Sequence, residues 1–361
     1  MSTLQQRPYR PWIGSAPQPH EAGDGERDRG QGSGTPGHAP ASPWSLRTLA
    51  RYVSLGVLAF VLLAGYWKPH PLPSLALPAV ALVWWWPVIR SRQTERWLFF
   101  YVAGIYLYTV LRAFADDLGM TVRAEYVISI DRGMFLGNVP TEQLQRAFFT
   151  PWRIDAIDLA AVATHWSFFV VPHGLFAFLW LRRRSLAPAY AAAMLITLYL
   201  GLLLFWLAPT VPPWLAGYQG DLRSTYRVMN FVTSGLDVGA YRELYATLAA
   251  PNAVASVPSI HMALTFLVLL SVRDMAPRWT WPLVAYNLLM AFSLVYLGEH
   301  YVFDLLVGIF VATVGHYALR SRFRRTEPPV APPPSSGRRD VIDLVAPRAS
   351  AAVPVVARVE R

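Results

Sequence analysis

Long apolar segments are the feature that most constrains the fold of this chain of 361 residues. Each segment is close to the roughly 20 residues that an α-helix needs to cross a bilayer. A lone strand in lipid would leave backbone N–H and C=O groups without partners, so we expect every segment to be helical. The segments cover residues 49–67, 73–89, 97–115, 157–181, 188–208, 256–273, 279–298 and 301–320. The sequence therefore predicts an all-α, polytopic membrane helical bundle with about eight transmembrane helices.

The composition supports a membrane protein and excludes several other classes. Hydrophobic residues make up 54% of the chain and charged residues only 15%, whereas soluble domains are about 25% charged. The chain has no cysteine, which excludes disulfides, thiol catalysis and cysteine-ligated metal sites. A net charge of +10 would suggest a nucleic-acid partner in a soluble protein. In a membrane protein it marks cytoplasmic loops, so we expect no nucleic acid partner.

The arginines predict how the segments are oriented. Arginine-rich connections and ends alternate with connections that carry one lysine or no basic residue, as the positive-inside rule requires for eight crossings. The arginine-rich sites are Arg47 and Arg51, Arg90 to Arg96, Arg182 to Arg184, Arg273 and Arg278, and Arg320 to Arg325. We therefore expect a multi-pass protein of the cell membrane with both termini in the cytoplasm. The long connections 116–156 and 209–255 then lie outside, each with a short interfacial helix, at 141–149 and 240–249.

Three groups of polar residues fall on the expected outer side. They are Pro209–Trp214, Val257–His261 and Gly298–Asp304. The last two groups lead directly into the sixth and eighth segments, so they lie at helix N-termini. A helix N-terminus presents free N–H groups and a partial positive charge, which suits an anion such as phosphate.

Two histidines and one aspartate in these groups suit phosphoryl transfer. His300 and Asp304 are four residues apart on one helical face, where a carboxylate can fix the imidazole tautomer and leave the other nitrogen as a nucleophile. His261 can act as general acid, and Ser259 can donate to a phosphoryl oxygen. Each residue alone is equally typical of a polar group at a helix end. Their occurrence together on one face favours a catalytic site.

These motifs resemble those of the type 2 phosphatidic acid phosphatase (PAP2) superfamily. Its P-S-x-H motif corresponds to Pro258–His261. Its S-R-x5-H-x3-D motif is matched in spacing by Ser293, His300 and Asp304, but Leu294 stands where the family has arginine. A clear K-x6-R-P motif is also missing from the sequence.

In both departures the sequence is similar to the inositolphosphotransferase branch of the superfamily, which includes fungal inositol phosphorylceramide synthase. Further phrases of that branch have counterparts over about residues 130–320. They are His165 to Pro172, Pro209 to Trp214, Asn252 before P-S-x-H, and His300 to Asp304.

The resemblance implies a lipid phosphate substrate and an active site on the extracytoplasmic face, without metal or other cofactor. It implies His300 as nucleophile, Asp304 as its orienting partner and His261 as general acid. It also implies that residues 97–325 form a catalytic transmembrane domain with a six-helix core, preceded by two additional transmembrane helices in residues 44–96. The polar ends, 1–43 and 326–361, are expected to be disordered cytoplasmic tails.

Candidates for substrate binding follow from the same comparison and from the charge of a phosphoryl group. The predicted substrate-binding residues are Ser259, His165, Asn252, Trp214, Arg223 and Arg227. His173 lies in the same segment as His165, further from the outer face. Because Leu294 stands where the family has arginine, we expect the two helix N-termini to balance part of the negative charge of a transferred phosphoryl group, with arginines of the outer loops adding to it. The candidates are Arg132, Arg153, Arg223, Arg227 and Arg242.

The predicted function is transfer of a phosphoinositol-like or phosphoryl group from a lipid donor through a phospho-histidine. A plain lipid phosphate or polyprenyl pyrophosphate phosphatase is the alternative with the same chemistry. A metal-dependent membrane hydrolase would use His261, His300, Asp304 and His165 as zinc ligands. A lipid transporter would often show two related halves, and the two halves of this sequence do not match.

Overall fold

The structure, a computed structural model, describes residues 45–64, 71–91, 94–113, 120–223, 225–236 and 254–324. The predicted tails and the predicted interfacial helix at 240–249 lie outside these residues. The described residues from Leu46 onward belong to one compact unit.

The described residues are all-helical, as predicted, and contain no strand among them. The helices are α1 (Leu46–Leu63), α2 (Pro71–Arg90), α3 (Arg96–Arg112), α4 (Glu125–Met134), α5 (Pro140–Phe148), α6 (Ala156–Ser167), α7 (Val171–Arg182), α8 (Ala187–Leu207), α9 (Pro213–Gln219), α10 (Val228–Gly235), α12 (Ile260–Met275), the 3-10 helix η1 (Pro277–Trp279), α13 (Thr280–Tyr296), α14 (Val302–Tyr317) and α15 (Arg320–Arg324). Each of the eight apolar segments is mainly helical where the structure describes it, and the fourth is divided between α6 and α7. The predicted interfacial helix at 141–149 corresponds to α5.

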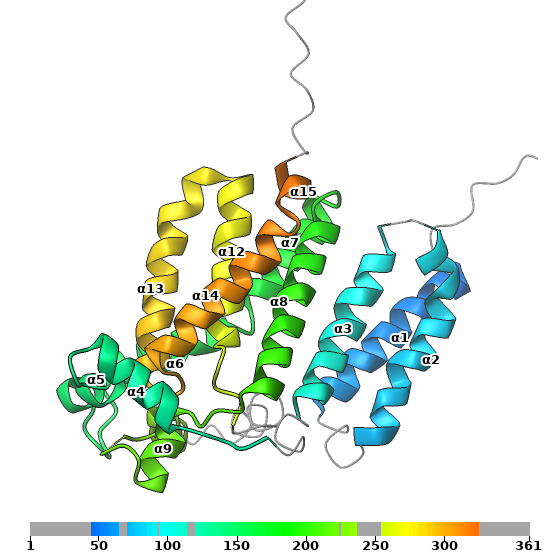
Figure 1. The fold of residues 1–361 in the computed structure, drawn as a ribbon. Helices are drawn as coiled ribbons and strands as arrows, with labels where there is room; N and C mark the ends of the chain where they lie inside the picture. The colour runs from blue at the N-terminus through cyan, green and yellow to red at the C-terminus, as the bar shows by residue number, and fades with distance from the viewer. Residues whose placement is uncertain are drawn as a thin grey trace, which may run out of the picture. The chain divides into compact units, whose positions relative to one another are not determined.

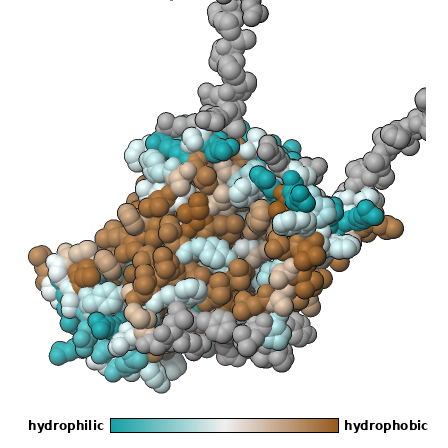
Figure 2. All heavy atoms as spheres, turned by 45° about the vertical axis from the view of Figure 1, so that its right-hand side comes forward, coloured by the Kyte–Doolittle hydropathy of each residue, from teal (hydrophilic) through white to brown (hydrophobic). Residues whose placement is uncertain are grey.

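The expectation of about eight membrane spans is confirmed only in part. In the described part of the chain, α1 and α8 are long and apolar enough to span a membrane, and α6 with α7 makes a third span if the bent pair is counted as one. The helices α3, α12, α13 and α14 have 16 or 17 residues, fewer than the roughly 20 of a typical span. Apolar side chains nevertheless cover the middle of the face in Figure 2, with hydrophilic residues toward its two ends. Exposed apolar surface of this extent is typical of contact with a membrane or another protein.

The bend between α6 and α7 has a local cause. The two helices meet at an angle of 41° across residues 168–170, just before Pro172. Proline lacks an N–H group and clashes with the preceding turn, so it interrupts the helical hydrogen bonds. The bend falls at Phe168, whose ring lies beside His261.

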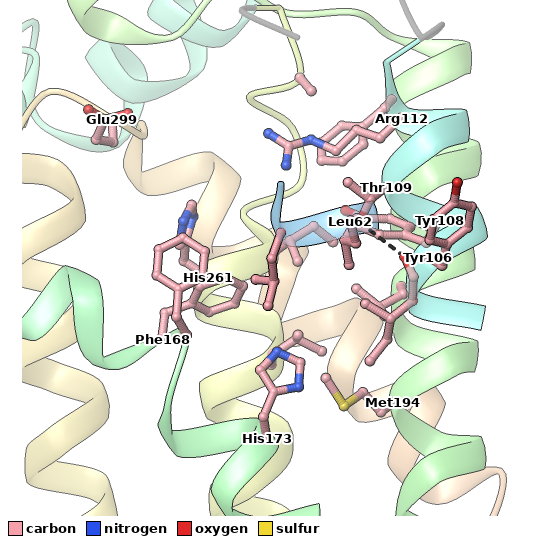
Figure 3. Close-up of a pocket in the computed structure, with 18 of the residues that line it drawn as sticks. Leu62, Tyr106, Tyr108, Thr109, Arg112, Phe168, His173, Met194, His261 and Glu299 are labelled. Atoms are coloured by element: carbon pink, nitrogen blue, oxygen red, sulfur yellow. Dashed lines mark hydrogen bonds between the residues drawn. The ribbon is translucent and has the colours of Figure 1, made fainter. Parts of the chain in front are cut away.

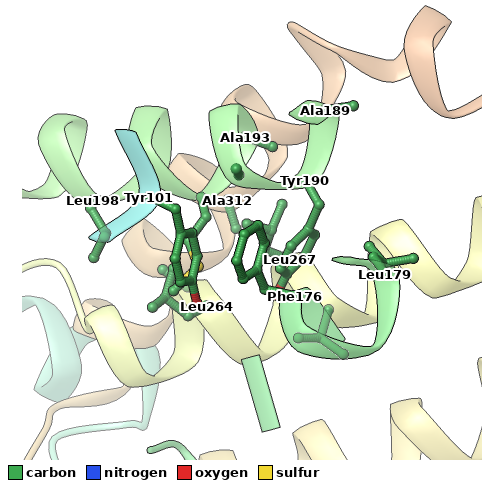
Figure 4. Packing of buried hydrophobic residues seen from close by; sticks show 14 of the residues in the cluster. Tyr101, Phe176, Leu179, Ala189, Tyr190, Ala193, Leu198, Leu264, Leu267 and Ala312 are labelled. Atoms are coloured by element: carbon green, nitrogen blue, oxygen red, sulfur yellow. The ribbon is translucent and has the colours of Figure 1, made fainter. Parts of the chain in front are cut away.

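Helix α12 lies at the centre of the bundle and packs against α14, α8, α13 and α7. The main core combines aromatic residues with small residues of α8, as Figure 4 shows for Tyr101, Phe176, Ala189 and Ala193. Tyr101 of α3 stacks on Phe176 of α7 with 3.6 Å between the ring centroids. Small residues let neighbouring helices approach closely, which suits bundles that gain little from hydrophobic burial in lipid.

The first three helices form a second core around Trp85, Phe99 and Tyr106. Helix α3 also packs along α8, so it joins α1 and α2 to the rest of the bundle.

Short helices gather at one end of the bundle. In Figure 1, α4, α5 and α9 lie at the end opposite α15 and the connection between α12 and α13. Helix α5 is fixed there by Gln145, whose Nε2 donates to the carbonyl oxygens of Tyr226 (2.8 Å) and Tyr296 (2.9 Å). This end also contains the residues that begin α12 and α14, and therefore the predicted catalytic histidines.

Candidate active site

Three side chains in mutual contact, those of Asp304, His300 and His261, form the centre of the site. His300 follows the turn at Gly298, which has a φ of +79° that favours glycine. His300 Nδ1 lies 3.1 Å from Asp304 Oδ2, and His300 Nε2 lies 3.2 Å from Nδ1 of His261. The predicted pairing of His300 with Asp304 is therefore present, and His261 faces the other nitrogen of His300.

Asp304 fixes the tautomer of His300. Its Oδ2 also accepts hydrogen bonds from Ser256 Oγ (2.6 Å) and from the backbone N–H of Tyr301 (3.0 Å). A carboxylate that accepts from His300 requires the proton on Nδ1, so Nε2 carries the lone pair. His261 Nδ1–H then donates to that lone pair, which places a nucleophilic nitrogen beside a proton donor.

Side chains already cap the two helix N-termini at which the sequence predicts an anion site. Ser259 is fully buried and accepts from the backbone N–H of Met262 at 3.3 Å, as the N-cap of α12. At the start of α14, the N–H groups of Val302 and Phe303 donate to the carboxylate of Asp131, at 3.1 and 3.0 Å. Burial raises the pKa of Asp131 to about 6, although these two N–H groups act to lower it.

A cavity of about 560 Å³ opens beside the histidines, within the range of about 300–1,000 Å³ typical of ligand sites. Its polar part contains His261, His300, Ser256 and Glu299. Its other walls are aliphatic and aromatic, and part of them is drawn in Figure 3. They include Leu58 and Leu62 of α1, Tyr101, Ile105 and Tyr108 of α3, Phe168, Phe169 and His173 around the start of α7, and Met194 and Leu198 of α8.

An ion pair borders the polar part of the cavity. Arg227 Nε and Nη2 donate to the two carboxylate oxygens of Glu299 at 2.8 and 3.1 Å, and the guanidinium lies 4.4 Å from the ring centroid of Trp214. Burial acts to raise the pKa of Glu299, but the charge and hydrogen bonds of Arg227 outweigh it and hold this pKa below its usual value. Trp214 and Arg227, both predicted substrate-binding residues, therefore line the cavity together.

The histidines of the fourth segment have different positions. His165 is fully buried, and its ring centroid lies 4.6 Å from that of His261, so it packs behind the general-acid candidate. His173 lines the cavity, and its Nδ1 is 2.6 Å from the hydroxyl oxygen of Tyr101.

Several predicted residues are not part of the cavity wall. Arg132, Arg153 and Arg223 are exposed and do not line it, and Arg153 pairs with Asp155 at 2.9 Å. Asn252 and Arg242 lie outside the described residues. The roles of all five stay predictions. Leu294 is fully buried in an apolar cluster with Met262, Met290, Val295 and Leu305.

The structure adds three polar residues that the sequence analysis did not assign. Ser256 supports Asp304, Glu299 pairs with Arg227, and Arg112 of α3 lines the cavity. Glu299 stands within the second motif, where its position beside His300 is a signal. Arg112 lies inside a predicted span, where an ionisable residue marks a candidate functional site.

A metal site is not evident in the described residues. Among them, no group of three or more His, Cys, Asp or Glu side chains is arranged to hold a metal ion. His261 Nδ1 instead faces His300 Nε2, and His300 Nδ1 faces Asp304 Oδ2. The zinc alternative thus has no support from the geometry.

A comparison with protein families matches residues 127–318, more than half of the chain, to a model described as the PAP2 superfamily. The match runs from α4 to just beyond α14 and includes both histidine motifs. Helices α1, α2 and α3 lie before it. No curated protein and no solved structure matched the chain.

Proposed function

Because the chain belongs to the PAP2 superfamily, we propose that it is an integral-membrane lipid phosphotransferase or phosphatase that acts through a phospho-histidine. The observation that carries this proposal is the row Asp304–His300–His261 at the edge of a cavity with apolar walls.

In the first half of the reaction, His300 Nε2 attacks the phosphorus of the lipid donor. A P–N bond forms and the bond from phosphorus to the leaving oxygen breaks. The imidazolium form of His261 gives its Nδ1 proton to that oxygen and is left neutral. Asp304 holds the His300 Nδ1–H and stabilises the positive charge that develops on the ring.

In the second half, an alcohol or a water molecule attacks the phosphorus and the P–N bond breaks. His261 takes the proton of the attacking O–H group, which restores both histidines. An alcohol acceptor gives transfer and water gives hydrolysis, so the two candidate activities share one intermediate.

The cavity supports a lipid donor. Its polar part lies at His261 and His300, and its aliphatic and aromatic walls suit a hydrocarbon tail. We propose transfer of a phosphoinositol-like or phosphoryl group as the main activity, following the resemblance to the inositolphosphotransferase branch. Plain hydrolysis of a lipid phosphate or polyprenyl pyrophosphate is the alternative. A screen of labelled lipid phosphates with and without inositol, separating free phosphate from transferred product, distinguishes them.

We place this site on the extracytoplasmic face of the cell membrane. The arginines of α15 and of the connections after α7 and α12 lie at the other end of the helices from His300. The positive-inside rule assigns the arginine-rich end to the cytoplasm.

The substitution His300→Gln tests the mechanism, with His316→Gln as the matched control. His300 lies just before the start of α14, whereas His316 lies in its last turn and pairs with Asp274. We expect His300→Gln to lower turnover of a lipid phosphate by more than about 1,000-fold and to abolish phosphate labelling of the denatured protein. His316→Gln should keep both the turnover of the lipid phosphate and the phosphate labelling. Undiminished turnover in His300→Gln would exclude the phospho-histidine mechanism.

A further inference from the structure

The source of positive charge for the phosphoryl group is not explained by the motifs. Leu294 cannot supply it, and it is fully buried among apolar residues away from the cavity. The N–H groups that begin α14 donate to Asp131, and Met262 N–H of α12 donates to Ser259. A phosphoryl group in transfer carries negative charge on three oxygens, so side-chain cations at the cavity have to balance it.

Two arginines line the cavity among the residues that the structure describes, Arg112 and Arg227. Arg227 forms a bidentate ion pair with Glu299, which orients its guanidinium toward that carboxylate. Arg112 is the last residue of α3. Figure 3 shows its guanidinium extending into the cavity toward the side where His261 and Glu299 lie.

We infer that Arg112 binds the phosphate or phosphodiester group of the substrate, in place of the arginine that the family has at the position of Leu294. A guanidinium suits this role because its planar N–H groups can donate to two phosphate oxygens at once. Arg112 precedes the family match, so this chain obtains the cation from a different helix. The inference rests on the proposed function and names the group that holds its substrate.

The test compares Arg112→Gln and Arg112→Lys with Arg96→Gln in the purified full-length protein. Arg96 begins the same helix, lies at its other end and does not line the cavity. The first measurement is the affinity for orthovanadate, a mimic of the phosphoryl group in transfer. This affinity is obtained from the increase in unfolding temperature that vanadate causes. The second is kcat and KM for a lipid phosphate.

We expect Arg112→Gln to bind vanadate about 10- to 100-fold more weakly than the unsubstituted protein and to lose kcat/KM to a similar extent. Arg112→Lys should recover part of the affinity, because it keeps the charge but not the bidentate geometry. Arg96→Gln should leave both measurements unchanged. A purely structural role would lower the unfolding temperature without vanadate and leave the vanadate affinity intact.

The inference is overturned if Arg112→Gln binds vanadate as tightly as Arg96→Gln. If Arg112→Gln does not fold, Arg112→Lys decides, and unchanged vanadate affinity in that variant counts against the inference. Normal lipid turnover together with undiminished vanadate binding in Arg112→Gln would refute this role and leave the proposed function standing. Vanadate binding that depends on Arg112, in a protein that turns over no lipid phosphate, would refute the proposed function alone.

Discussion

Single carboxylates organise the candidate site at the scale of residues. Asp304 combines a local contact, with His300 one helical turn before it, and a distant one, with Ser256 at a separation of 48 residues. The local contact follows from helical geometry, so the sequence predicts it. The contact with Ser256 depends on how α12 and α14 begin side by side, and only the folded chain shows it.

Glu299 gives a pH-dependent prediction at this scale. Arg227 holds the pKa of Glu299 below its usual value, against the effect of burial, so the folded state favours the carboxylate. The stability that this provides is present above the usual pKa of about 4.3 and is lost as the pH falls through the lower pKa of the folded state. We expect Glu299→Gln to cost about 3 kcal/mol at pH 7, because it leaves the Arg227 charge buried without its carboxylate.

The test is the free energy of unfolding of the unsubstituted protein and of Glu299→Gln, measured from pH 7 down to pH 3.5. The difference in this free energy between the two proteins should become smaller at acidic pH. Glu95→Gln is the control, since it breaks an exposed pair with Arg184 and should cost less than about 1 kcal/mol. If the difference in unfolding free energy between the unsubstituted protein and Glu299→Gln stays constant with pH, then Arg227 does not stabilise the Glu299 carboxylate in the folded state.

At the scale of elements, the crossing of α12 and α14 sets the distance between His261 and His300, the two histidines of the proposed mechanism. Gly308 of α14 faces the backbone of Ser259, where an added Cβ would lie 2.5 Å from the Ser259 carbonyl oxygen. His261 is the second residue of α12, and His300 lies two residues before the start of α14. A change in the crossing therefore moves His261 relative to His300.

Gly308→Ala should accordingly reduce stability by about 1–3 kcal/mol and lower kcat. Gly174→Ala is the matched control, because that glycine also lies in a helix but an added Cβ meets no atom within 4 Å. It should be neutral or stabilising by up to about 1 kcal/mol, since alanine favours helix more than glycine does. The free energy of unfolding and the steady-state kcat, measured for both variants, test this prediction. Equal stability and activity in the two would show that the helix crossing does not limit the site.

At the scale of the whole molecule, the proposed orientation places α9 outside and the connection between α7 and α8 inside. The chain has no cysteine, so one introduced thiol reports its side of the membrane without background. Tyr218 of α9 is 88% exposed, and Ser185 between α7 and α8 is exposed as well.

In intact cells, Tyr218→Cys should react with a membrane-impermeant maleimide, and Ser185→Cys should react only after permeabilisation. The unsubstituted chain is the control for background labelling. The reverse pattern would place the candidate site in the cytoplasm.

The sequence by itself determined the helical class, the approximate position of each apolar helix, the pair His300 and Asp304, and the family. These depend on local periodicity and on motifs contained in short stretches of chain. The bend at Phe168–Val170 was not predicted, although Pro172 offered a local signal.

Only the tertiary structure decided which distant residues share the cavity. It brought Ser256 to Asp304 and Arg227 to Glu299, and it placed Arg112 of α3 in the same cavity as His261 and His300. It also showed Asp131 at the N-terminus of α14, where the sequence predicts an anion site. Such contacts depend on how helices far apart in the sequence pack, which the periodicity of a single segment does not specify.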